Sequence, residues 1–230
     1  VFDILEYRPG ATRRLPVSYR SILAPTWPDR LSQAGKSTLL VNVPLTYPPP
    51  ELRGVVVAGG VVPPGRTFSH PADVGPRLDW PINGGSWTTF RHKPLELLAD
   101  LEELTRRRAA ATRALLDEQP WDAACIVFVS PDRLQHCLLE YVHPGHPRHK
   151  EVAASPVAER VRDVFRLLDG ELATLVERTD DDDLVMVMSD HGHQPCTRAL
   201  SMNKVLEHLG LLRFGRGSAV VNLLAWGRVR

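Results

Sequence analysis

The sequence lacks the features that define several large classes of protein. Its 230 residues include only three cysteines, too few for a disulfide scaffold, and this odd number fits a reducing compartment such as the cytoplasm. No run of apolar residues approaches the length of 18 that a membrane-spanning helix needs. The 28 basic residues nearly balance the 27 acidic ones, which argues against a nucleic-acid-binding scaffold. With 43% hydrophobic and 24% charged residues, the composition is that of a globular protein with a substantial core.

The chain also lacks an initiator methionine and any signal-peptide pattern at its start. It ends in a segment that is still rich in valine, leucine and tryptophan. We therefore expect residues 1–230 to be an internal part of a longer protein and to form one partial catalytic domain.

Short apolar runs bounded by turn-forming residues alternate with longer segments of helical periodicity. The runs predict four buried strands, at Leu39 to Val43, Gly54 to Ala58, Cys125 to Val129 and Leu184 to Met188. Apolar residues at helical spacing predict helices at Leu95 to Leu115, from the Ser155-Pro156 cap to Leu175, and at Met202 to Leu209. This alternation predicts an α/β fold with a mostly parallel central sheet and helices on both faces. A segment rich in proline and glycine, at about 61–94, is expected to be an insertion that influences substrate choice.

Two pairs of aspartate and histidine follow two of these predicted strands. Asp132 and His136 come after the third strand, and their spacing places them on one face if a helix begins nearby. Asp190 and His191 come directly after the fourth strand and would diverge if the chain stayed extended. A tight turn at Gly192 would let both face one ion. Ligands of open α/β sheets bind at the carboxyl ends of the strands, so we expect both pairs to converge at that rim as metal ligands.

These two motifs resemble the type I phosphodiesterase/nucleotide pyrophosphatase family of the alkaline phosphatase superfamily. The similarity is strongest in Asp132-Arg133-Leu134-Gln135-His136 and in Ser189-Asp190-His191-Gly192. Further similar segments cover most of the chain, and they are Trp27 to Lys36, Val41 to Pro48, Tyr141 to Pro147 and Asn203 to Leu212.

The resemblance implies an alkaline-phosphatase-like fold and a hydrolase that uses two divalent metal ions, commonly zinc, to cleave a small phosphoric ester or nucleotide. It implies that Asp132 and His136 hold the ion on the side of the attacking water and the leaving group. It implies that Asp190 and His191 hold the ion that activates a threonine or serine nucleophile.

Other groups of the family pattern have no counterpart in this sequence. They are an upstream aspartate, the nucleophile and a downstream histidine, so we expect them to lie outside residues 1–230. With one carboxylate and one imidazole for each ion, this stretch alone is expected to bind zinc weakly and to hydrolyse nothing at a useful rate.

The sequence leaves some alternatives open. His193, two residues after His191, is interpreted either as a substrate contact or as a polar loop residue. The superfamily also includes phosphomutases, phosphonate hydrolases and sulfatases, and a degenerate relative can act purely as a binding protein. The identity of the nucleophile distinguishes phosphate from sulfate chemistry, since a modifiable cysteine indicates a sulfatase.

Overall fold

The computed structural model describes residues 5–6, 15–60, 62–81, 93–196, 198 and 200–213. These residues belong to two compact units, Val1–Gln194 and Pro195–Arg230, which are considered separately. The first unit contains a four-stranded sheet with the order β5-β4-β3-β6, together with a short antiparallel pair, β1-β2. The strands are β1 (Leu5–Glu6), β2 (Leu15–Pro16), β3 (Thr38–Val41), β4 (Gly54–Val57), β5 (Ser69–His70) and β6 (Ala123–Ile126).

The sheet is mostly parallel, as the sequence predicts. β3 pairs in parallel with both β4 and β6, while β5 pairs antiparallel with β4. β3 is buried on both faces, which explains why its sequence is a continuous apolar run rather than an alternating one. Leu39 and Val41 pack toward one face with Val57, and Leu40 packs toward the other with Val56.

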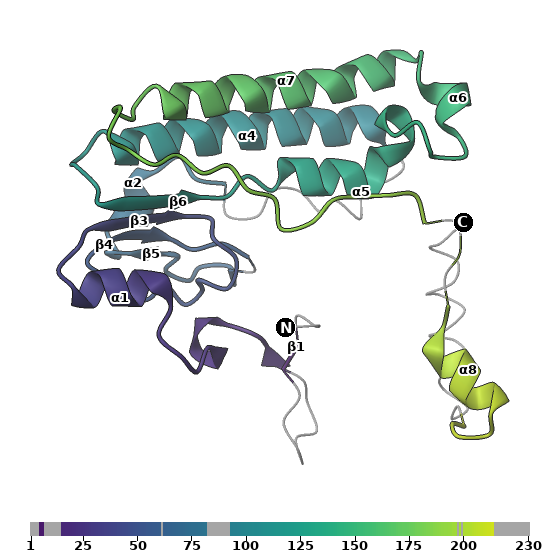
Figure 1. Ribbon diagram of the computed structural model, residues 1–230, viewed down its shortest axis with the longest axis horizontal. Coiled ribbons are helices and arrows are strands. Elements are labelled where there is room, and N and C mark those ends of the chain that lie inside the picture. Colours follow the sequence, from purple (N-terminus) through teal and green to yellow (C-terminus); the bar gives the residue numbers. More distant parts are fainter. Residues whose placement is uncertain are drawn as a thin grey trace. The chain divides into compact units, whose positions relative to one another are not determined.

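Long helices cover one face of this sheet (Figure 1). The last turns of α4 contribute Ala111 and Leu115 to the core against β3 and β4. The first half of α4 forms a second core with α5 and α7, centred on Leu98, Leu134 and Val161. Figure 1 shows α1 on the opposite side of the sheet from these helices. The helices of this unit are η1 (Tyr19–Ser21, a 3-10 turn), α1 (Trp27–Gln33), α2 (Val74–Arg77), α4 (Pro94–Leu116), α5 (Ser130–Val142), α6 (His149–Val152) and α7 (Pro156–Val176).

The predicted long helices are present with nearly the expected bounds. The Ser155 hydroxyl accepts a hydrogen bond from the Ala158 N–H at 3.3 Å, so it caps α7 as its sequence position indicates. In the second unit, α8 (Met202–His208) ends just before Gly210, whose φ of +70° is the left-handed conformation favoured after a helix. Among the described helices, none is both long enough and apolar enough to cross a membrane.

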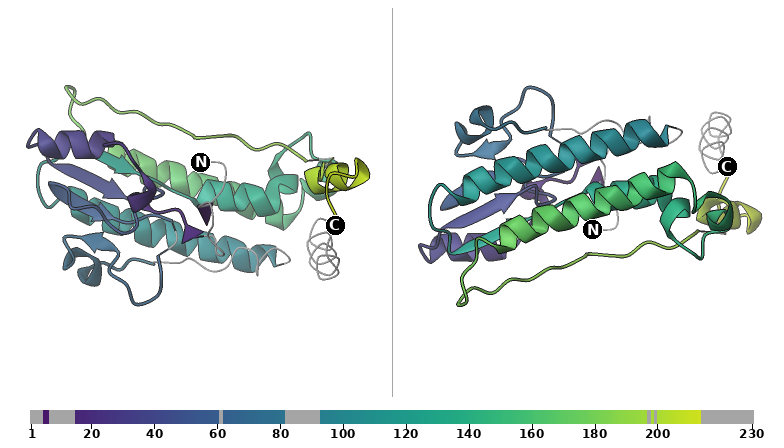
Figure 2. Two further views of the ribbon diagram at one scale, coloured as in Figure 1. Left: turned by 90° about the horizontal axis from the view of Figure 1, so that it is seen from below. Right: turned by 90° about the horizontal axis from the view of Figure 1, so that it is seen from above.

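The predicted fourth strand, at Leu184 to Met188, is wrong. The segment forms no strand, and its side chains are exposed, with Leu184 at 87% and Met188 at 77%. It follows α7 as an extended trace that runs back in the opposite direction to that helix (Figure 2). Among the described residues, β6 is therefore an edge strand of the sheet, paired only with β3.

The described part of the proline- and glycine-rich segment contains regular structure. Its described part, residues 62–81, contains the edge strand β5 and the short helix α2. Trp80 is buried in the sheet core, and the Arg108 guanidinium of α4 lies 5.0 Å from the centre of its ring. Residues 61 and 82–92 of the expected insertion lie outside the described residues, as do Val1-Phe2-Asp3 and residues 214–230.

Three chain segments are joined where β3 and β4 end. Asn42 has a φ of 59°, and its side-chain amide donates to the Val127 carbonyl at 2.8 Å. Gly59 packs directly on the Asn42 backbone, and its own N–H donates to the Thr46 hydroxyl at 2.9 Å. This junction fixes the end of β6, from which the chain leads into α5.

Asp122 ties the beginnings of β3 and β6 together. Its carboxylate accepts a hydrogen bond from the Ser37 N–H at 2.7 Å and lies 2.9 Å from the Lys36 ammonium. These contacts lower the pKa of Asp122 from its ordinary value of 3.8 to about 2, and the hydrogen bond from Lys36 has the largest effect. The ionised carboxylate thus stabilises the fold above pH 4, and this stabilisation is lost as the pH falls from about 4 through about 2.

We expect Asp122→Asn to lower the urea midpoint of unfolding at pH 7, because the amide keeps the shape of the side chain but loses the charge. The difference from wild type should shrink as the pH falls from 4 toward 2, as measured by circular dichroism. Asp181→Asn, in the exposed turn after α7, is the control and should change nothing. An Asp122 effect that is equally large at low pH would contradict this assignment.

Candidate metal centre

Helix α5 presents Asp132 and His136 on one side because its other side is anchored in the core. Leu134 and Leu138 are 0% and 2% exposed and pack against α4 and α7. Asp132 and His136 alternate with these two leucines, so they lie on the opposite side of the helix, where their side chains are 45% and 51% exposed. The predicted helix near Asp132 is therefore present and displays both residues as expected.

The first turn of α5 is held by a buried hydroxyl pair. The Ser130 hydroxyl lies 2.6 Å from that of Thr105 on α4, and Thr105 also donates to the Leu101 carbonyl at 2.7 Å. Ser130 follows closely after β6, so the sheet, α4 and α5 together position Asp132.

Three imidazoles surround one carboxylate oxygen of Asp132. Oδ1 lies 3.3 Å from Nε2 of His136, 3.4 Å from Nε2 of His193 and 3.7 Å from Nε2 of His191. The His193 ring meets those of His136 and His191 edge-on, with ring centres 4.8 and 5.1 Å apart. Residues from two distant parts of the chain thus converge on one point.

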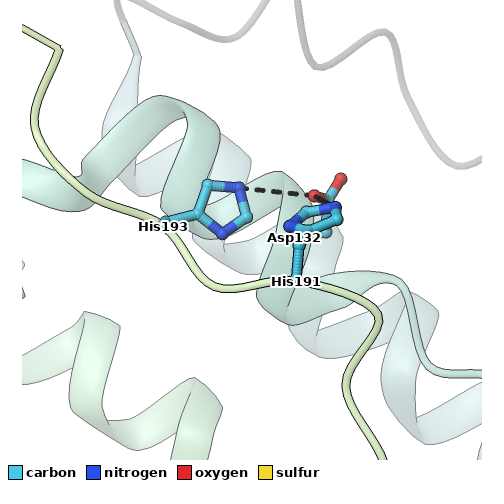
Figure 3. Close-up of side chains that lie close together, drawn as sticks. All are labelled: Asp132, His191 and His193. Atoms are coloured by element: carbon cyan, nitrogen blue, oxygen red, sulfur yellow. Dashed lines mark ion pairs between the residues drawn. The ribbon is translucent and has the colours of Figure 1, made fainter. Parts of the chain in front are cut away.

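The segment after α7 directs alternate side chains toward Asp132. His191 and His193 both point from it toward the carboxylate on α5 (Figure 3). Asp190 is adjacent to His191 and therefore falls on the other side of the segment. Its side chain is 90% exposed, whereas that of His193 is 12% exposed. In an extended chain, residues two apart share a side and adjacent ones do not, so this geometry brings His193 in and leaves Asp190 out.

The donor atoms fit a divalent ion. One ligand atom each from Asp132, His191 and His193 lies within 4.8 Å of the others. Tetrahedral zinc with bonds of about 2.0–2.1 Å separates its ligand atoms by about 3.3 Å, close to the spacings around Asp132 Oδ1. An imidazole and carboxylate donor set suits zinc and related transition metals.

Arg133, the residue after Asp132, sets the local electrostatics. Burial lowers the pKa of its guanidinium, and the neighbouring Asp100 and Asp132 partly oppose that shift by stabilising its charge. One of its nitrogens, Nη1, is buried without a hydrogen-bond partner. The cluster therefore lies beside a fixed, partly buried positive charge.

The structure brings together most of the residues that the sequence selects. Asp132 and Asp190 each place a carboxylate oxygen 3.7 Å from Nε2 of His191, so the two oxygens are separated by at most twice that distance. His191 thus joins Asp132 and His136 although no strand precedes it, whereas Asp190 lies on the exposed side of the segment. His193 lies as close to Asp132 as the predicted ligands His136 and His191 do. The His-x-His spacing is the signal that identifies it.

A separate cavity of about 410 Å³ lies between α2 and α4. It is lined by Arg77, Leu78, Asp79, Arg106, Arg107, Ala110, Ala111 and Ala114. None of these residues belongs to the Asp/His cluster, and Arg107 is already paired with Asp79.

Comparison with known families identifies the chain. The profile of the type I phosphodiesterase/nucleotide pyrophosphatase family matches residues 12–229, nearly the whole chain. The chain therefore belongs to this family, and its α/β architecture is consistent with the alkaline-phosphatase-like fold. A search of curated proteins and a search of solved structures each found no significant match. Membership implies hydrolase activity of the phosphodiesterase type.

Proposed function

We propose that this protein is a metal-dependent hydrolase that cleaves phosphodiester or nucleotide pyrophosphate bonds, with two divalent ions that we expect to be zinc. The observation that carries the proposal is the convergence of His136 from α5, and of His191 and His193 from the segment after α7, around the Asp132 carboxylate. Family membership supplies the class of reaction. The expected ligands are Asp132 and His136 for one ion, and Asp190 and His191 for the other.

The chemistry assigns distinct tasks to these residues. Bound divalent ions would polarise the phosphoryl oxygens and lower the pKa of a hydroxyl nucleophile. The Asp132 carboxylate would supply the negative charge that balances a cation bound beside the imidazoles. Exposure of His136 and His191, at 51% and 52%, leaves one side of the cluster open to a phosphoryl group. The proposed nucleophile is a threonine or serine, and no such residue in this chain is assigned that role.

The proposal is tested by assaying the intact gene product with bis-p-nitrophenyl phosphate, p-nitrophenyl phosphate and p-nitrophenyl sulfate. We expect the diester to be the preferred substrate, activity to disappear after dialysis against a chelator, and zinc to restore it. The inactive chelated protein and the restored protein should have the same circular dichroism spectrum.

Other results would contradict the proposal. Faster cleavage of the sulfate ester would indicate a sulfatase. Tight metal binding without hydrolysis of the diester or of a dinucleoside pyrophosphate would indicate a binding protein. Chelator-resistant diester hydrolysis would exclude the metal-dependent mechanism.

A further inference from the structure

We infer that His193 is a direct metal ligand and that it completes a three-residue site with Asp132 and His191. The inference rests on the proposed metal dependence, but it goes beyond the two Asp/His pairs of the motifs. For the ion that His193 binds, the inference replaces the pairing of ligands within each motif, because Asp132 comes from one motif and His191 and His193 come from the other. It also assigns His193 to metal binding instead of substrate contact.

Both ring nitrogens of His193 lack a hydrogen-bond partner although they are buried. Nδ1 and Nε2 each expose less than 1 Å² and make no hydrogen bond. Nε2 lies 3.4 Å from Asp132 Oδ1 and is directed toward it (Figure 3). A buried polar atom without a partner costs about 1–3 kcal/mol, and an ion coordinated by both side chains would satisfy this nitrogen.

The burial of His193 favours a role as metal ligand over a role in substrate binding. Its side chain is 12% exposed, whereas His136 and His191 are about half exposed. A residue that binds substrate has to present its donor to the open side, and His193 is the least accessible of the three imidazoles. Its location therefore suits the inner side of an ion whose outer side faces solvent.

The contacts of the surrounding segment support the same role. Among the described residues, 184–194 donate no backbone hydrogen bond to the rest of the unit, and the Ser189 hydroxyl bonds within the segment, to the His191 carbonyl. The polar and ring contacts that reach another element run from His191 and His193 to Asp132 and His136 on α5. On α5, His193 thus approaches the carboxylate with which it would share an ion.

The test compares zinc affinity in the intact gene product, using competition with a chromophoric chelator, for wild type, His193→Gln and His193→Asp. Loss of an outer-shell partner commonly costs about 10–100-fold in metal affinity, so removing a direct ligand should cost at least about 100-fold. His193→Asp supplies a carboxylate donor in place of the imidazole and should recover most of the affinity. His146→Gln, a histidine in the connection after α5, is the matched control and should bind zinc like wild type.

The visible spectrum of the cobalt-substituted protein provides a readout that does not depend on activity. His193→Gln should alter the ligand-field bands, whereas His146→Gln should not. Unchanged zinc affinity and cobalt spectrum in His193→Gln would overturn the inference, and a raised KM with these unchanged would assign His193 to substrate. Weakened binding in a protein that hydrolyses no ester would support the inference while refuting the proposed function.

Discussion

Asp132→Asn should lower diester hydrolysis by at least about 10³-fold, comparable to the largest losses seen when one electrostatic group is removed from an active site. Asp132 is the residue that all three imidazoles of the cluster approach within 3.7 Å. Asparagine preserves its size but removes the charge that balances a divalent cation. The measurement is kcat/KM with bis-p-nitrophenyl phosphate, together with zinc content after dialysis.

A matched aspartate outside the cluster provides the control. Asp163 on α7 is also a partly exposed helical residue, and it pairs with Arg166 at 2.8 Å. Asp163→Asn should retain full activity and zinc content. If Asp132→Asn kept both near the wild-type level, the cluster around Asp132 would not be the catalytic centre.

Gly59→Ala should destabilise the first unit by at least about 3 kcal/mol, at the upper end of what overpacking costs. A Cβ at this position would overlap the backbone of Asn42 and Val43, which cannot move without displacing the end of β3. The same change would strain the hydrogen bond from the Gly59 N–H to Thr46. Urea unfolding followed by circular dichroism measures the effect.

At Gly170, substitution by alanine is expected to have the opposite effect on stability. It lies within α7, and an added Cβ there would meet no atom within 4 Å. Gly170→Ala should therefore stabilise the protein by roughly 0.5–1 kcal/mol, through helix propensity alone. If Gly59→Ala were as well tolerated as Gly170→Ala, the close packing of Gly59 on the backbone of Asn42 and Val43 would be refuted.

The elements that could be predicted are those that form because of their own sequence pattern. Apolar spacing determines α4 and α7, because one face of each has to be buried, and each begins with a first-turn proline. In α7 the Ser155 cap adds a second signal. Buried parallel strands such as β3 are continuous apolar runs, and the sequence shows them directly.

Other elements form only when a neighbouring strand is available to pair with them, and their own sequence pattern does not show whether one is. Leu184 to Met188 has the same composition as a buried strand, but pairing with a neighbour decides whether such a run becomes one. In the proline- and glycine-rich segment, β5 exists because β4 offers it an edge. For the site, Asp132 and His136 followed from helical spacing, whereas the inward position of His193 required the actual path of residues 190–193.

That path has a consequence for the thermodynamics of the whole unit. An ion shared by Asp132 and His191 would join positions about 60 residues apart in the sequence, as a removable cross-link. Because the folded unit would bind the ion and the unfolded chain would release it, the ion would stabilise the fold by about 2.7 kcal/mol at a free concentration of 100 times its Kd, a substantial share of the stability of an ordinary domain. The concentration of free metal would then determine how much of the time residues 184–194 stay bound to α5. It would also determine how well these residues resist proteases.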